Sequence, residues 1–182
     1  MTMALTNFPW RHKFTTRADA AATLAQALSA FQGLPGALVI APPGGSFVLA
    51  REVAARLGSE LLCAEPQGPF PEVEGRCVIV IHDALSQSAR ALQTIVALHP
   101  RRPAVIVIAT PVSSARVRHL IRPCVSRFVC LAAVDEIGVV DHWFTDEVDP
   151  TAGMNWGTEA RNEEHSTTLG MPMRHGERRL SA

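Results

Sequence analysis

Short apolar runs and longer amphipathic stretches alternate along this chain. Four to six consecutive Val, Ile, Leu or Ala residues, bounded by Gly, Pro or polar residues, predict strands buried on both faces. Apolar residues at spacings of three and four predict helices between them. The predicted strands span 37–41, about 60–64, 78–81, 104–109 and 127–131, and the predicted helices about 16–31, 47–57, 86–99 and 113–121. This alternation predicts right-handed βαβ units and hence a three-layer α/β domain, with an open parallel sheet and helices on both faces.

Polar residues end two of the predicted strands. The apolar run 78–81 stops at His82 and Asp83, and a loop of small and hydroxyl residues then leads into a helix. The run 37–41 is followed by two prolines and then by Gly44 and Gly45. Because open parallel sheets bind ligands at the carboxyl ends of their strands, both loops are candidate ligand-binding segments.

Local signals mark the ends of the first two helices. Thr16 and Asp19, three residues apart, match a capping box, and Gly33 and Gly58 follow the last periodic positions as expected for helix ends. Beyond Pro150 the chain is polar and lacks sustained periodicity. We therefore expect one domain over residues 1–150 and an irregular tail over 151–182.

Composition and charge narrow the possible classes of protein. The chain has 182 residues, 47% of them hydrophobic, with 17 basic and 17 acidic residues. The balance gives no argument for a nucleic-acid or membrane partner, and no run approaches the roughly 20 apolar residues of a membrane-spanning helix. Residues 1–14 contain no apolar core long enough for a signal peptide, and the four cysteines show no C-x-x-C spacing. We therefore expect a cytoplasmic, reduced protein.

Charge is unevenly distributed along the second half of the chain. Residues 84–134 contain seven arginines and no acid, and an acidic segment, 135–149, follows at once. One interpretation is a helix surface whose charge the acidic segment balances in space. The other is a positive rim near the carboxyl edge of the sheet, suited to a phosphorylated ligand.

Several enzyme motifs are absent. The sequence has no G-x-S-x-G, no G-x-x-x-x-G-K-[ST] and no G-x-G-x-x-G after a strand, which argues against hydrolase, NTPase and dinucleotide-binding classes. The histidines show no H-E-x-x-H or other metal-binding spacing, so no metal site from protein side chains is expected.

The order of these pieces resembles the type I phosphoribosyltransferases, specifically the small bacterial predicted phosphoribosyltransferases. The resemblance rests on the glycine pair after an early strand, on residues 80–90, on Thr110, Pro111 and Val112, and on an aromatic segment near 143. It implies a protein that binds phosphoribosyl pyrophosphate or a nucleotide, with Mg²⁺ if it is catalytic. An active protein would transfer the 5-phosphoribosyl group to a base.

The resemblance also implies roles for individual residues. It makes Asp83 the catalytic carboxylate, which holds the ribose. It assigns the phosphate and ribose to His82, Asp83, Ser86, Gln87, Ser88, Ala89 and Arg90, the pyrophosphate to Pro43, Gly44 and Gly45, and base stacking to Trp143 and Phe144.

The sequence departs from the family pattern at four places. His82 replaces the first acid of a pair, Gln87 and Ser88 replace Thr-Gly, Pro43 replaces an arginine, and the link between residues 63 and 77 is too short for the family's lid. Two hypotheses follow. One is a phosphoribosyltransferase-like protein that binds a phosphoribosyl or nucleotide ligand. The alternative is a non-catalytic descendant that acts as a nucleotide sensor or interaction module. A homo-oligomer is compatible with either.

Overall fold

A computed structural model of the protein describes residues 14–65, 68, 70 and 72–154. Six strands form one parallel sheet. They are β1 (Leu38–Ala41), β2 (Glu60–Cys63), β3 (Cys77–Ile81), β4 (Ala84–Leu85), β5 (Val105–Ser114) and β6 (Arg127–Val134). β1 lies between β2 and β3, β3 pairs with β5, and β5 also pairs with β4 and β6.

β3 and β4 follow one line along the sheet. Ile81 pairs with Ala109 and Ala84 pairs with Val112, so both strands meet β5 with the same offset. His82 and Asp83 form the two-residue break between them. The break therefore places these two polar residues within the sheet's carboxyl half rather than in a loop beyond it.

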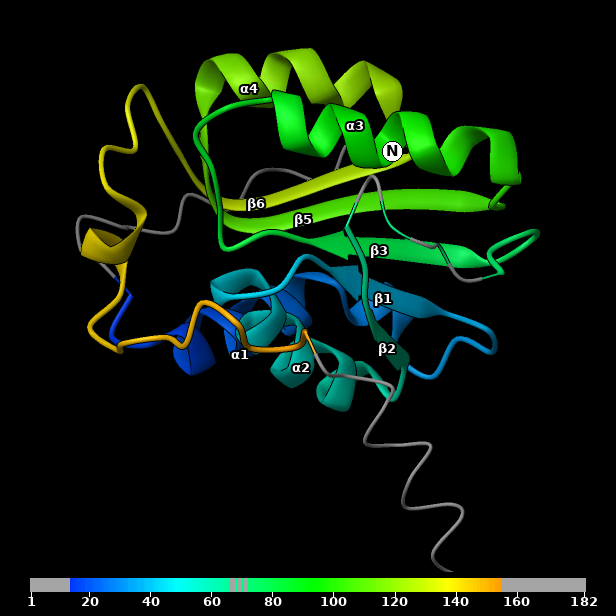
Figure 1. Cartoon of the computed structure of the whole chain (residues 1–182), viewed down its shortest axis with the longest axis horizontal. Coiled ribbons are helices and arrows are strands. Elements are labelled where there is room, and N and C mark those ends of the chain that lie inside the picture. Colours follow the sequence, from blue (N-terminus) through cyan, green and yellow to red (C-terminus); the bar gives the residue numbers. More distant parts are fainter. Residues whose placement is uncertain (1–13, 66–67, 69, 71, 155–182) are drawn as a thin grey trace, which may run out of the picture.

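Two helices cover each face of the sheet (Figure 1). α1 (Arg17–Ala27) and α2 (Gly45–Leu57) lie on one face, and α3 (Ala89–Leu98) and α4 (Ala115–Ile121) lie on the other. Short 3-10 helices span Ser29–Phe31, His99–Arg101, Arg122–Cys124 and Val140–Trp143. The predicted three-layer architecture is confirmed.

Alternate strand residues fill two separate cores, as expected for a sheet buried on both faces. Val39, Ile79 and Val107 pack with α1 and α2, whereas Ile40 and Val80 pack with α3 and α4. Because both faces of the central strands are buried, these strands are continuous apolar runs in the sequence.

The predicted helix ends are largely confirmed. The Thr16 side chain accepts a hydrogen bond from the Asp19 backbone N–H and caps α1, and Gly58 ends α2 in the left-handed conformation, at φ 66°. α1 ends earlier than predicted, at Ala27, and a 3-10 turn continues to Phe31.

The strands at the carboxyl edge are longer than predicted. β5 continues through Pro111 to Ser114, and β6 continues to Val134. Proline usually interrupts a strand because it lacks an N–H. Here Pro111 lies between the paired residues Thr110 and Val112 without a ladder partner of its own, so its missing donor removes no pairing bond.

The boundary between the domain and the tail remains a prediction. Residues 151–154 form a turn, and the rest of the predicted tail lies outside the described residues, so the domain boundary is untested. Of the helices within the described ranges, none has the length and apolar character needed to cross a bilayer.

Candidate ligand-binding site

The sheet changes direction of winding between β1 and β3. The chain passes from β1 to β2 on one side and then to β3 on the other. In open parallel sheets such a switch point opens a crevice at the carboxyl ends of the strands, where ligands bind. Gly44 and Gly45 follow β1 and Asp83 follows β3, so the fold brings these predicted site residues together.

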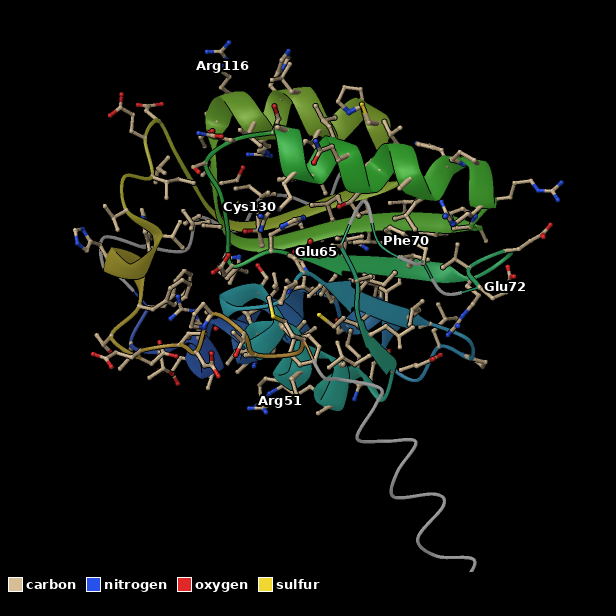
Figure 2. All side chains as sticks on the ribbon, viewed as in Figure 1. Arg51, Glu65, Phe70, Glu72, Arg116 and Cys130 are labelled. Atoms are coloured by element: carbon tan, nitrogen blue, oxygen red, sulfur yellow. The ribbon has the colours of Figure 1, made fainter. Side chains whose placement is uncertain are left out.

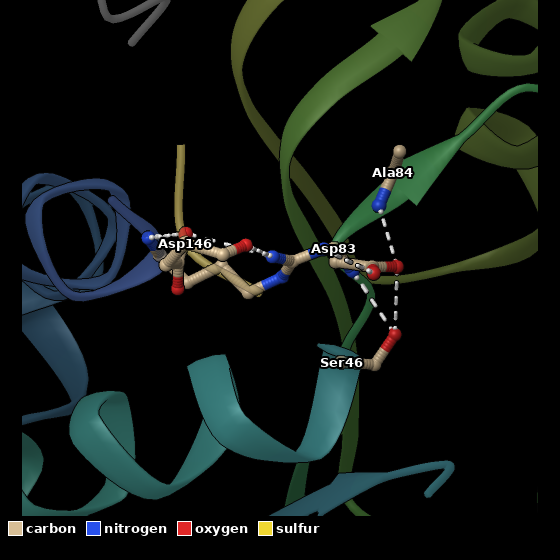
Figure 3. A network of polar contacts seen from close by, with 5 residues as sticks. Ser46, Asp83, Ala84 and Asp146 are labelled. Atoms are coloured by element: carbon tan, nitrogen blue, oxygen red, sulfur yellow. Dashed lines mark hydrogen bonds and ion pairs between the residues drawn. The ribbon is translucent and has the colours of Figure 1, made fainter. Parts of the chain in front are cut away.

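Asp83 is held by the start of α2 (Figure 3). The Ser46 hydroxyl donates to Asp83 Oδ1 at 3.0 Å and accepts from the Asp83 backbone N–H at 3.1 Å. The Ala84 N–H donates to the same Oδ1 at 3.0 Å. Oδ1 is thus engaged on two sides, which fixes the direction of the other carboxylate oxygen, Oδ2.

Oδ2 of Asp83 faces a buried arginine at the start of α1. Arg17 is 2% exposed, and its Nη2 lies 3.9 Å from Asp83 Oδ2. Its Nη1 donates to the Asp146 carbonyl oxygen at 2.9 Å and lies 3.5 Å from the Asp146 carboxylate. The Phe144 ring lies under the guanidinium, 4.4 Å from Cζ to the ring centroid. Arg17 therefore joins the segment after β6 to the carboxylate after β3.

Gly45 lies where no side chain fits. A Cβ at this position would stand 2.4 Å from Asp83 Oδ2 and 3.0 Å from Arg17 Nε. Gly45 is the first residue of α2, so its backbone makes no special demand. The crowding comes from the neighbouring charged groups, which already occupy the space in front of the glycine.

Gly44 is covered by the segment 149–154. Its N–H donates to the Ala152 carbonyl oxygen at 2.9 Å, and a Cβ here would lie 3.3 Å from the Pro150 carbonyl oxygen. Gly153, at φ 91°, lies so close to the Phe47 ring that a Cβ would stand 2.4 Å from it. The predicted pyrophosphate loop is thus closed by the chain itself, with Pro43 beside it half-buried.

The predicted phosphate loop, residues 86–90, is open by comparison. Ser86, Gln87, Ala89 and Arg90 are exposed, and Ser88 is half-buried. Ser88 precedes α3 at φ −81°, so a serine replaces glycine there without left-handed strain. No hydrogen bond from the backbone N–H of Ser86, Gln87 or Ser88 to another described residue is present. These donors and the start of α3 suit an anion.

His82, unlike this open loop, is buried. It is 3% exposed, and its Nε2 has no hydrogen-bond partner among the described residues. Burial, together with the positive charge of Arg90, lowers the pKa of His82 from 6.5 to about 4. The imidazole is therefore neutral near pH 7, and its assignment to phosphate or ribose remains a prediction.

The aromatic pair lies against the core on the α1 side. Phe144 is 5% exposed and stacks on Phe14, with the ring centroids 6.0 Å apart. Trp143 is half-buried, and its Nε1 donates to the Ile137 carbonyl oxygen at 2.8 Å. The stacking role stays a prediction, and of the two rings Trp143 is the more accessible to a base.

Comparison with known proteins gives likeness in structure only. No protein-family model and no curated protein matches the sequence. The structure of TT1426 from Thermus thermophilus is similar at a TM-score of 0.65 and 20% identity, over 74% of this chain and 91% of that one. A purine phosphoribosyltransferase from Pyrococcus horikoshii is similar at a TM-score of 0.50 and 17% identity, over 75% of this chain and 94% of that one. A hypoxanthine-guanine-xanthine phosphoribosyltransferase is similar at a TM-score of 0.51 and 15% identity, over 68% of this chain and 79% of that one.

The chain has the type I phosphoribosyltransferase fold. The fold implied by the sequence resemblance is therefore confirmed. Within the phosphoribosyltransferase fold, Gly44, Gly45 and Asp83 occupy the switch point, and residues 86–90 begin the helix after β3. The roles of these residues remain proposals.

Mg²⁺, which the resemblance implies, prefers an octahedron of oxygen ligands. Among the described residues no group of three or more His, Cys, Asp or Glu side chains is placed to hold a metal. The carboxylate at the switch point, Asp83, already faces the cationic Arg17. The residues present do not fit a directly bound Mg²⁺.

Three residues of the site were missed from the sequence: Arg17, Ser46 and Asp146. One signal pointed toward Arg17, because the capping box places it in the first turn of the helix that precedes β1. Such a helix runs antiparallel to the strands, so it begins at their carboxyl edge. No comparable signal pairs Arg17 with Asp146, which lies 129 positions away.

Proposed function

We propose that the protein binds a ligand with a ribose 5-phosphate group, of the nucleoside 5′-monophosphate class, without transferring the phosphoribosyl group. The observation that carries the proposal is the contrast between two loops of one switch-point site. The loop after β3 is exposed and offers N–H groups that donate to no acceptor within the described part of the chain. The loop after β1 is covered by residues 150–153.

A single phosphate suits the open loop. Phosphates bind where several backbone N–H groups converge at the start of a helix. Ser86 and Ser88 add hydroxyl donors, and Arg90, in the first turn of α3, adds a positive charge. These groups lie beside the break at Asp83, which puts the phosphate loop next to the carboxylate proposed to hold the ribose.

A pyrophosphate group, in contrast, lacks a matching site. The Gly44 N–H is already bonded to the Ala152 carbonyl oxygen. A pyrophosphate there would also approach the Pro150 carbonyl oxygen, another hydrogen-bond acceptor. Two acceptors facing each other repel, so the loop after β1 favours a ligand without pyrophosphate.

The first test is binding by the full chain of a panel of nucleoside 5′-monophosphates and ribose 5-phosphate. Isothermal titration calorimetry gives the affinity, and thermal unfolding gives the stabilisation. A ligand at 100 times its dissociation constant should add roughly 2.7 kcal/mol. The matching nucleosides, which lack the phosphate, should bind at least about tenfold more weakly. Failure of every phosphorylated compound to bind would refute the proposal.

Substitution of Arg90 tests the loop itself. Arg90→Ala removes a charge-assisted contact to the phosphate, and we expect a loss of about tenfold in affinity, or about 1.4 kcal/mol. The matched control is Arg51→Ala. Arg51 is an exposed arginine on α2, across the sheet from α3, and its side chain points away from the sheet (Figure 2). Equal losses in the two variants would mean that the arginine effect is general rather than local.

A second candidate is phosphoribosyl transfer, favoured by the presence of Asp83, Gly44 and Gly45 together at the switch point. It is tested by pyrophosphate release from phosphoribosyl pyrophosphate with a panel of bases and Mg²⁺. We expect no release above that of Asp83→Asn, since the pyrophosphate loop is covered. Release by the wild type that Asp83→Asn abolishes would establish the transferase.

A further inference from the structure

The charge of the switch point is set by Arg17. Its guanidinium lies close to both Gly45, the first residue of α2, and Asp83 Oδ2, the carboxylate oxygen after β3. Its Nη2 faces Asp83 and its Nη1 faces Asp146, the two carboxylates labelled in Figure 3. Arg17 is thus the cation of a cluster that contains two carboxylates.

The position of Arg17 is fixed by contacts on several sides. Thr16 caps the helix in which Arg17 is the first residue. The Arg17 backbone N–H donates to the Asp146 carboxylate at 3.1 Å, and Nη1 donates to the Asp146 carbonyl oxygen at 2.9 Å. Phe144 covers one face of the guanidinium. A side chain held in this way and only 2% exposed is a built part of the site, unlike a mobile surface arginine.

A divalent cation and Arg17 compete for the same carboxylate oxygen. An Mg²⁺ bound to Asp83 Oδ2 lies about 2.1 Å from it, and the Arg17 Nη2 is already 3.9 Å from that oxygen. Two cations held beside the same carboxylate oxygen repel strongly in a partly buried site. The other oxygen, Oδ1, is engaged by Ser46 and Ala84.

We propose that the Arg17 guanidinium takes the place of a divalent metal ion at this site, so that the protein binds its phosphorylated ribose ligand without a metal. The inference rests on the proposed function for its ligand. Arg17 neutralises Asp83 from within, and the carboxylate then accepts ribose hydroxyls without the repulsion that a free carboxylate exerts on a phosphate. The ligand class is accordingly a metal-free nucleoside monophosphate rather than its magnesium complex.

The first experiment compares the affinity of the wild-type full chain for a nucleoside 5′-monophosphate in EDTA and in excess magnesium chloride. We expect the two dissociation constants to agree within about twofold. A gain of tenfold or more with magnesium overturns the inference and leaves nucleotide binding intact. Failure to bind in both buffers refutes the proposed function instead. The Mn²⁺ experiment described next then still tests the inference, because it needs no nucleotide.

The second experiment needs no nucleotide. Mn²⁺ serves as the probe, and its binding to the full chain is measured by electron paramagnetic resonance. We expect Arg17→Gln to bind Mn²⁺ at least tenfold more tightly than the wild type, because Asp83 and Asp146 lose their cation. The control is Arg76→Gln, which removes another arginine from an ion pair, that with Glu60 at 2.6 Å, near the amino ends of the strands.

Further variants keep this test decisive. Arg17→Lys retains the charge and should bind Mn²⁺ as poorly as the wild type, whereas a purely structural role for the guanidinium would make Lys and Gln equivalent. If Arg17→Gln does not fold, Arg17→Gln combined with Asp146→Asn removes one unpaired carboxylate and leaves Asp83 to bind the probe. Wild-type Mn²⁺ binding as tight as that of the Gln variant contradicts the inference.

Discussion

His82 illustrates how one buried residue couples the site to pH. Its folded-state pKa of about 4 lies below the ordinary value of 6.5 because burial and Arg90 oppose a positive charge. Protonation therefore favours the unfolded chain. The stabilising contribution is fully present above pH 6.5 and is lost as the pH falls toward 4, about 3 kcal/mol in all.

His82→Gln should remove this part of the pH dependence. We expect the wild type to lose about 3 kcal/mol more than the variant between about pH 7 and pH 4. Urea unfolding at a series of pH values measures the difference. The control is His119→Gln, at an exposed histidine of α4, which should keep the wild-type slope. Parallel profiles for wild type and His82→Gln would show that the buried imidazole does not titrate as described.

At the residue scale, the sequence predicted the positions that follow strands and missed those that meet across the chain. Gly44, Gly45 and Asp83 were found because each follows an apolar run with a clear end. Ser46 carries no such signal, because a serine in the predicted loop before the helix over 47–57 is unremarkable in sequence. Its double hydrogen bond to Asp83 depends on a contact between residues 37 positions apart, which periodicity does not report.

Helix α1 connects the stability of an element to the geometry of the site. Its first turn depends on Thr16, whose hydroxyl accepts from the Asp19 N–H at 3.1 Å. Its first residue is Arg17. Loss of the cap therefore loosens the turn that carries the guanidinium.

Thr16→Ala should lower the free energy of unfolding by about 1 kcal/mol, the usual cost of losing a side-chain cap. Thr16→Ser keeps the hydroxyl and should stay within a few tenths of the wild type. Chemical denaturation of the three proteins measures both values. An alanine variant as stable as the serine variant would mean that the Asp146 contacts alone fix the start of α1.

Among the elements, the boundaries at the carboxyl edge were predicted least well. β5 extends past its apolar centre because Thr110, Ser113 and Ser114 take part in the sheet although they are polar. Their hydroxyls find local acceptors and donors: Thr110 donates to the Val112 carbonyl oxygen, and Ser114 accepts from the Val117 N–H. Polar residues whose hydrogen bonds are satisfied can extend a strand, but they leave no hydrophobic pattern in the sequence.

At the scale of the whole molecule, alternation of strands and helices was sufficient to predict the architecture. The segment 149–154, which covers Gly44, was not predictable, because it has no periodicity and its contacts are with residues about 100 positions earlier in the sequence, Gly44 and Phe47. The acidic segment was expected to balance arginines of 84–134 or to leave them as a rim. Its Asp146 instead pairs with Arg17 on α1, and Arg90 stays exposed at the start of α3.

The crowding at Gly45 also imposes an order on sequence change. A larger residue at position 45 clashes with Asp83 and Arg17 as long as both remain, whereas Gly44 is crowded by the backbone of Pro150. A mutational path that enlarges residue 45 must therefore change both Asp83 and Arg17 first. Larger residues at position 45 become useful only afterwards, so a library that varies this position while keeping Asp83 and Arg17 yields only variants that carry the clash.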